Sequence, residues 1–135
     1  MCSSDLKGQG KLVEAEPFFR RALEGRERTL GSDHPHTLNS VNYLGSLLQD
    51  QGKLVEAEPF YRRALEGRER ILGRDHPQTL ASVNNLGSLL NGQGKLVEAE
   101  PFFRRALEGG ERTLGRDHHQ TLTSVNSVEI GRAHV

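Results

Sequence analysis

The chain has 135 residues, of which 18 are basic and 18 acidic, so its formal net charge is zero. A neutral chain with few aromatic residues lacks the positive surface and the stacking platforms of nucleic-acid-binding proteins, and it lacks the positive patch that draws proteins to anionic membranes. The chain has a single cysteine, which excludes an internal disulfide framework and a zinc site made of several thiolates. No apolar run approaches the roughly 18 residues of a membrane span.

One segment occurs three times. The sequence GKLVEAEPFFRRALEGRERTLG begins at Gly10 and recurs with few changes from Gly52 and from Gly94, each time 42 residues further along the chain. Fixed periods of about 20–50 residues are typical of solenoids, propellers and other arrays, in which each unit buries its apolar surface against its neighbours. The spacing of apolar residues inside the unit therefore decides which of these architectures the chain adopts.

Two helical faces follow each other within the unit. Leu38, Val41, Leu44 and Leu48 are spaced by three or four residues, as on one face of an α-helix. The recurring segment carries a second such face, formed by Leu54, Ala57, Tyr61, Ala64, Leu65 and Leu72. No segment alternates with a period of two, so strands and a propeller are excluded. We therefore predict an all-α solenoid whose unit is a helix A, a short turn and a longer helix B.

The predicted elements begin with an incomplete unit. A helix B at 12–30 stands first without a helix A before it, and full repeats follow at 35–72 and 77–114. A partial helix A at 119–128 ends the array, which therefore spans 7–128.

Proline and glycine mark the ends of the helices. Pro35 and Pro77 suit the first position of helix A, where the N–H that proline lacks would be unpaired in any case. Gly52 and Gly94 suit the turn between helices A and B, because a positive φ costs glycine little. Gly67 lies in the middle of helix B and costs about 0.5–1 kcal/mol relative to alanine, so helix propensity predicts that Gly67→Ala raises the melting temperature.

Both ends of the chain depart from the repeat. Residues 1–6 (MCSSDL) and 129–135 (EIGRAHV) resemble the translation of a short-read sequencing adapter and of its reverse complement. We expect both segments to be non-native tails on a fragment of a longer array, and we leave them out of the fold interpretation. The array is then expected to lack a capping helix at either end, which favours self-association through the uncapped ends.

The recurring pattern resembles the tetratricopeptide repeat. It consists of Leu44 and Gly45 on helix A, Gly52 in the turn, and Ala57, Tyr61, Ala64 and Leu65 on helix B, and it returns at Leu86, Gly87, Gly94, Ala99, Phe103, Ala106 and Leu107. The 42-residue period, with its longer helix B and the connector LGRDHPQT, is similar to the kinesin light chain variant of this family. The resemblance implies a right-handed α-α superhelix. Two aromatic positions of the family pattern are aliphatic here, which implies a thinner core: Val41 and Val83 on helix A, and Leu54 and Leu96 on helix B.

No motif in the chain predicts catalysis. The GQGK sequences at Gly8–Lys11 and Gly92–Lys95 lack the strand and the Ser or Thr of a phosphate-binding loop, so we predict a helix–helix turn at both places. We expect no catalytic residue, no cofactor and no enzymatic activity.

The histidines lack the spacing of metal ligands. His34 and His76 stand one repeat apart in equivalent connectors, and His118 and His119 form an adjacent pair without further ligands at zinc-site spacing. We assign these histidines to connectors and helix starts, and we predict no metal site.

Polar residues of helix A form the candidate binding surface. In tetratricopeptide proteins helix A lines the concave groove, so the resemblance implies that these side chains face a partner. Carboxamides both donate to and accept from a peptide backbone, but they can equally hydrogen-bond a neighbouring repeat, and the sequence leaves both roles open. The candidate residues are Asn39, Asn42, Ser46, Gln49, Asn84, Ser88, Asn91 and Asn126.

The resemblance implies protein–protein recognition, with an extended peptide or partner segment held in the concave groove. One alternative is a regulatory or sensor arm of a larger signalling enzyme or ATPase that lies outside this chain, and another is a self-association module. The expected partner is a protein or peptide, with no nucleic acid and no membrane, and the expected compartment is the cytoplasm.

Overall fold

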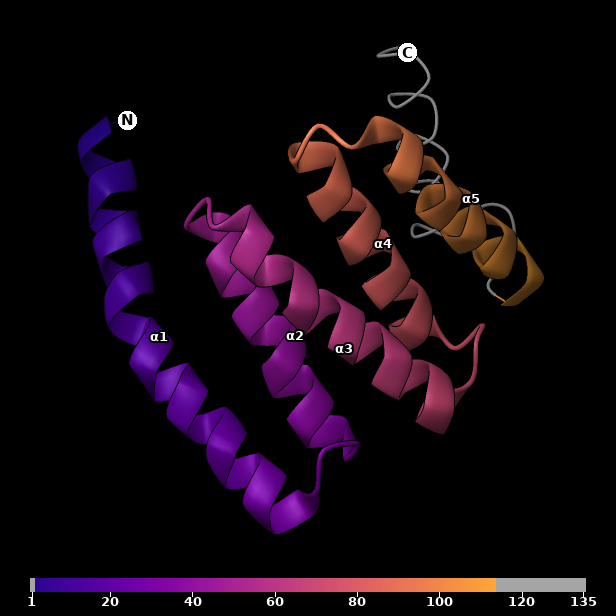
Figure 1. Cartoon of the computed structure of the whole chain (residues 1–135), viewed down its shortest axis with the longest axis horizontal. Helices are drawn as coiled ribbons and strands as arrows, with labels where there is room; N and C mark the ends of the chain where they lie inside the picture. Colours follow the sequence, from indigo (N-terminus) through magenta and orange to yellow (C-terminus); the bar gives the residue numbers. More distant parts are fainter. Residues whose placement is uncertain (1, 114–135) are drawn as a thin grey trace. The chain divides into compact units, whose positions relative to one another are not determined.

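A computed structural model describes residues 2–113, with side chains from 11 to 113, as five α-helices without a strand (Figure 1). The all-α prediction is therefore confirmed over this part of the chain. The helices are α1 (Cys2–Leu30), α2 (Pro35–Asp50), α3 (Leu54–Leu72), α4 (Pro77–Gly92) and α5 (Leu96–Thr113). In the terms of the repeat, α2 and α4 are A helices, and α1, α3 and α5 are B helices.

The chain divides into two compact units, one up to Ala64 and one from Leu65. The first unit contains α1, α2 and the first part of α3, and the second contains the rest of α3, α4 and α5.

The A helices begin at histidine–proline pairs. His34 and His76 are the N-cap residues, and each side-chain Nδ1 accepts a hydrogen bond of 3.1 Å from the backbone N–H two residues on. Pro35 and Pro77 then occupy the first helical position, as predicted. The cap satisfies one of the N–H groups that a helix start leaves without a partner. The assignment of these two histidines to helix starts is therefore confirmed.

The turns between A and B helices depend on glycine. Gly52 has a φ of 80° and Gly94 a φ of 81°, in the left-handed region that side chains disfavour. The N–H of the following lysine reaches back to the carbonyl of Leu48 in one turn and of Leu90 in the other, each at 2.9 Å. This closing pattern confirms the predicted turn at both glycines.

The turn predicted at Gly8–Lys11 is wrong. Helix α1 begins at Cys2 and runs through this segment to Leu30, although the same GQGK sequence forms the end of α4 and its turn at Gly92–Lys95. Glycine permits a reversal without requiring it, and residues 2–7 contain no proline that would stop a helix. The backbone therefore keeps its helical hydrogen bonds. The prolines within α1, α3 and α5 likewise interrupt none of these helices.

The predicted apolar faces form the core of each unit. In the first unit Leu23 of α1 packs with buried side chains of α2 and with Ala64, and Phe19 and Phe60 lie against this cluster. Gly45 lets α2 and α3 approach closely, because a Cβ there would lie 2.9 Å from Cδ1 of Tyr61. In the second unit the buried side chains of α4 and α5 include Leu80, Val83, Leu86, Leu90, Ala99, Phe103 and Ala106.

Candidate peptide-binding surface

Two of the predicted binding residues, Ser46 and Gln49, lie beside a buried tyrosine. Tyr61 on α3 is only 2% exposed, and its hydroxyl donates a 2.7 Å hydrogen bond to Oε1 of Gln49. Burial raises the pKa of Tyr61, while a hydrogen bond from Ser46 acts in the opposite direction. A buried phenol needs such partners, so Ser46 and Gln49 have a structural role.

The equivalent residues of the next repeat are not used in this way. Phe103 stands where Tyr61 stands one repeat earlier, and it has no hydroxyl to satisfy. Ser88, the equivalent of Ser46, is exposed on α4, and Asn91, the equivalent of Gln49, is half-buried. Because phenylalanine replaces tyrosine in this repeat, the side chains of Ser88 and Asn91 have no hydroxyl there to hydrogen-bond.

The asparagines that share one helix-A position are half-buried. Asn42 lies on α2 and Asn84 on α4, whereas the third member, Asn126, lies outside the described residues. The Oδ1 atom of Asn84 is buried and has no hydrogen-bond partner among the described residues. Asn39, the remaining candidate, is exposed on α2.

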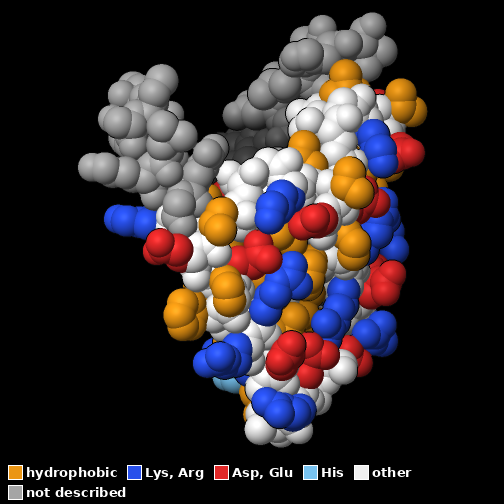
Figure 2. All heavy atoms as spheres, turned by 60° about the vertical axis from the view of Figure 1, so that its left-hand side comes forward, with side chains coloured by type: hydrophobic (Ala, Val, Ile, Leu, Met, Phe, Trp, Pro, Cys, Tyr) orange, Lys and Arg blue, Asp and Glu red, His pale blue; other side chains and the backbone are white. Residues whose placement is uncertain are grey.

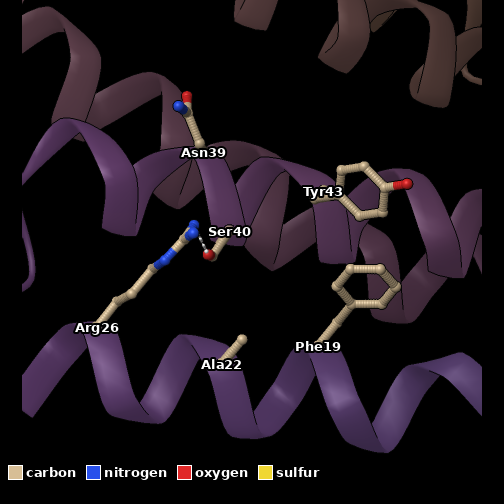
Figure 3. A pocket seen from close by; sticks show the side chains of 6 residues that line it. All are labelled: Phe19, Ala22, Arg26, Asn39, Ser40 and Tyr43. Atoms are coloured by element: carbon tan, nitrogen blue, oxygen red, sulfur yellow. Dashed lines mark hydrogen bonds between the residues drawn. The ribbon is translucent and has the colours of Figure 1, made fainter.

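A hollow between α1 and α2 was not predicted from the sequence. Its volume is about 180 Å³, which is below the range of about 300–1,000 Å³ typical of small-molecule sites. Figure 3 shows three lining side chains from each helix: Phe19, Ala22 and Arg26 from α1, and Asn39, Ser40 and Tyr43 from α2. Of these residues only Asn39 was a candidate. The residue in the sequence that could have indicated this hollow is Tyr43, an aromatic residue at the position that Asn85 fills in the next repeat.

On each of the first two B helices, an arginine donates hydrogen bonds to the A helix that follows. Arg26 donates from Nη1 to Ser40 Oγ at 2.7 Å and to the carbonyl of His36 at 3.1 Å. One repeat later Arg68 donates to Ser82 Oγ at 2.8 Å and to the carbonyl of Gln78 at 3.3 Å. Arg68 is only 7% exposed, and burial lowers the pKa of its guanidinium. Arg26 is exposed, and the third equivalent position is glycine.

The described residues contain no group of three or more His, Cys, Asp or Glu side chains that could hold a metal ion. In the same part of the chain no helix is both long and apolar enough to cross a membrane.

These observations define an all-α helical repeat, and the family comparison identifies it. The tetratricopeptide repeat family matches residues 36–109 and 80–128, and a second model of that repeat matches residues 3–36. The chain therefore belongs to the tetratricopeptide repeat family, a family of protein-interaction scaffolds built as α-α superhelices. No curated protein matches the chain by sequence.

Solved structures show the same fold. A kinesin light chain protein of Podosopora anserina with nearly identical TPR-like repeats is similar with a TM-score of 0.83 at 24% identity, over 96% of this chain and 62% of that one. A single-residue variant of that protein gives a TM-score of 0.84 at 23% identity over the same shares of both chains. BtubC (BKLC) from P. vanneervenii gives 0.82 at 23% identity, over 96% of this chain and 51% of that one. These structures share the fold of this chain, which spans between half and two thirds of each matched chain.

Proposed function

We propose that the chain binds an extended peptide segment of a protein partner along its A helices. The observation that carries this proposal is the carboxamide of Asn84, whose Oδ1 has no partner among the described residues. An incoming backbone N–H would satisfy this oxygen after a small rotation of the side chain, and the amide nitrogen would donate to a peptide carbonyl. Ser88 and Asn91 add two more polar side chains along the same helix.

Recognition on this surface would depend on hydrogen bonds more than on charge. Helix α4, Pro77–Gly92, contains no Asp, Glu, Lys or Arg, and α2 contains only Asp50. Charged interfaces lose affinity as salt screens them, whereas hydrogen bonds between neutral groups do not. We therefore expect the affinity for a bound peptide to change little between low and physiological salt.

Selection from a library of linear peptides displayed on phage, followed by calorimetry with the selected peptides, tests the proposal. Asn84→Ala should weaken binding about tenfold or more, as expected when a polar group loses its partner at an interface. Gln78→Ala is the matched control, because it removes an exposed carboxamide from the start of the same helix. It should leave the affinity unchanged.

The stability of Asn84→Ala separates binding from packing. If the carboxamide serves a ligand, the free energy of unfolding should stay within about 0.5 kcal/mol of the wild-type value. A loss of about 1–3 kcal/mol would assign Asn84 to repeat packing and contradict the proposal. So would selected peptides that bind Asn84→Ala and the wild-type chain equally well.

A further inference from the structure

Helix α4 ends on the only asparagine–glycine pair of the chain. Its last two residues are Asn91 and Gly92, and no other asparagine in the sequence precedes a glycine. Glycine carries no Cβ, so it leaves the backbone nitrogen that follows the asparagine side chain unshielded. In the first repeat the equivalent residues are Gln49 and Asp50, so the repeat itself does not require this pair.

The side chain of Asn91 is not held in place. It is half-buried and has no hydrogen-bond partner within the described residues. Its equivalent Gln49 accepts the 2.7 Å hydrogen bond from Tyr61, whereas Phe103 offers Asn91 no hydroxyl. The carboxamide of Asn91 is therefore free to rotate until its Cγ atom faces the backbone nitrogen of Gly92.

The backbone of this pair lies where α4 gives way to the turn that leads to α5 (Figure 1). The carbonyl of Asn91 accepts a 3.0 Å hydrogen bond from the N–H of Gly94, whose φ is 81°. The last turn of a helix opens at a lower free-energy cost than its middle, because fewer hydrogen bonds must break. Asn84 and Asn85, which lie in the middle of α4, lack this freedom.

We propose that Asn91 is a site of spontaneous deamidation, at which the backbone nitrogen of Gly92 displaces ammonia from the asparagine side chain. Asparagine is among the thermally labile residues, and the open helix end lets its neighbour react with it. The Gly92 nitrogen gives its proton to hydroxide and attacks Cγ of Asn91. The bond between these two atoms forms, the bond from Cγ to Nδ2 breaks, and Nδ2 takes up a proton and leaves as ammonia.

Water then opens the resulting cyclic imide in one of two ways. Cleavage between Cγ and the Gly92 nitrogen gives aspartate, whereas cleavage between that nitrogen and the backbone carbonyl carbon of residue 91 gives isoaspartate. The net reaction takes up water and releases ammonia, and it needs no oxidant, metal ion or enzyme. Isoaspartate also routes the main chain through the side chain, so the acceptor of the Gly94 hydrogen bond leaves the main chain and the turn before α5 is disturbed.

Either product introduces a charge into an uncharged helix. Helix α4 contains no Asp, Glu, Lys or Arg. Charges are frequent elsewhere, since Figure 2, which brings the α1 side of Figure 1 forward, shows acidic and basic side chains interspersed on that side. A carboxylate in the last turn of α4 faces the negative end of the helix macrodipole, which makes this helix end less stable.

Deamidation would also alter the surface that we propose for peptide binding. A carboxamide both donates and accepts hydrogen bonds, whereas a carboxylate only accepts them. Conversion of Asn91 should therefore weaken the binding of an extended peptide as the protein ages. Only this consequence rests on the proposed function, because the reaction at Asn91 does not depend on any ligand.

Incubation of the full chain at mildly alkaline pH, followed by peptide mass spectrometry at successive times, tests the proposal. We expect deamidation at Asn91 to proceed faster than at any other asparagine, and to accelerate with pH because the attacking nitrogen must lose its proton. Methylation by an isoaspartyl methyltransferase should detect the isoaspartate product. An equal or faster reaction at another asparagine overturns the proposal, as does an absence of reaction at Asn91.

Two control variants copy the first repeat, where the same residues are compatible with the fold. Asn91→Gln reproduces Gln49 and should abolish the reaction, because glutamine would have to close a larger ring. Gly92→Asp reproduces Asp50 and should slow deamidation of Asn91, because a side chain now shields the attacking nitrogen. Deamidation of Asn91 at the wild-type rate in Gly92→Asp overturns the proposal.

Peptide affinity before and after incubation tests the consequence separately. The aged wild-type chain should bind the selected peptides more weakly than the fresh chain, whereas aged Asn91→Gln should keep the affinity that it had when fresh. Unchanged affinity of a fully deamidated wild-type chain would overturn the effect on binding, while the mass spectra would still establish the modification.

Discussion

Helices α1 and α5 show that one repeated face can be buried in one helix and exposed in another. Both carry LVEAEPFFRRALEG, yet Ala106 is buried and Ala22 is exposed. The glycine of this segment is tightly packed in one helix, at Gly109, and has open space around it in the other, at Gly25. The residues of a repeat thus specify a surface that fits a helix, and the neighbouring helix decides whether that surface is buried.

The largest expected difference comes from placing a charge on this surface. Ala106→Arg forces a long cationic side chain between α4 and α5, and overpacking and desolvation together should lower the free energy of unfolding by about 3 kcal/mol or more. Ala22→Arg places the same side chain in solvent and should change stability by less than about 0.5 kcal/mol. Urea denaturation of both variants measures the difference. Equal losses would show that the two faces are covered to the same extent.

A smaller change should reverse its sign between the two helices. Gly25→Ala adds a methyl group in open space, so the better helix propensity of alanine should stabilise the chain by about 0.5–1 kcal/mol. Gly109→Ala must displace Leu80 and should destabilise it by about 1–3 kcal/mol. Melting temperatures of the two variants provide the test, and a gain at Gly109 would contradict the close packing of α4 on α5.

The arginines that tie B helices to A helices should also differ. Removing Arg68 leaves Ser82 and the Gln78 carbonyl without this buried donor, so Arg68→Ala should cost about 1–3 kcal/mol. Arg26 makes the equivalent bonds in an exposed position, where water can replace it, and Arg26→Ala should cost less than about 1 kcal/mol. Chemical denaturation of each variant gives both values, and a larger loss at Arg26 would contradict this order.

The smallest expected effect is a pH-dependent change in the free energy of unfolding, and it concerns Glu16 on α1. The hydrogen bond from Arg20, with contributions from Gln51 and Lys53, lowers the pKa of Glu16 below its usual value of 4.5. A carboxyl whose pKa is lower in the folded state stabilises the fold above its unfolded pKa, and this stabilisation is lost as pH falls through the folded pKa. Glu16→Gln should therefore cost up to about 1 kcal/mol at neutral pH and less in acid. A cost that does not shrink below pH 4.5 would contradict the ion pairing.

The sequence predicted the parts of the fold that are local or repeated. The spacing of Leu38, Val41, Leu44 and Leu48 located a buried face, and proline and glycine located the helix ends. Local signals failed where context decides the outcome: the GQGK segment stays helical in α1 and turns after α4. Helix propensity predicts a gain in stability from alanine at Gly67, and this glycine is buried, so packing as well as propensity bears on that prediction.

The sequence also predicted only part of the candidate site, because the partners of side chains depend on contacts between helices. Position in the repeat identified the asparagines of the A helices, but it could not show that Ser46 and Gln49 are engaged by a buried tyrosine. That engagement depends on the contact between α2 and α3. The hollow beside Tyr43 depends in turn on the packing of α1 against α2.

Thiol labelling most directly tests whether a neighbouring helix, and not the sequence, decides the burial of this repeated face. Cys2 is first replaced by serine, and a single cysteine is then introduced as Ala22→Cys or as Ala106→Cys. We predict that the thiol at position 22 reacts with a maleimide at nearly the rate of the denatured chain and that the thiol at position 106 is protected at least about a hundredfold. Equal labelling rates at the two positions would contradict the account.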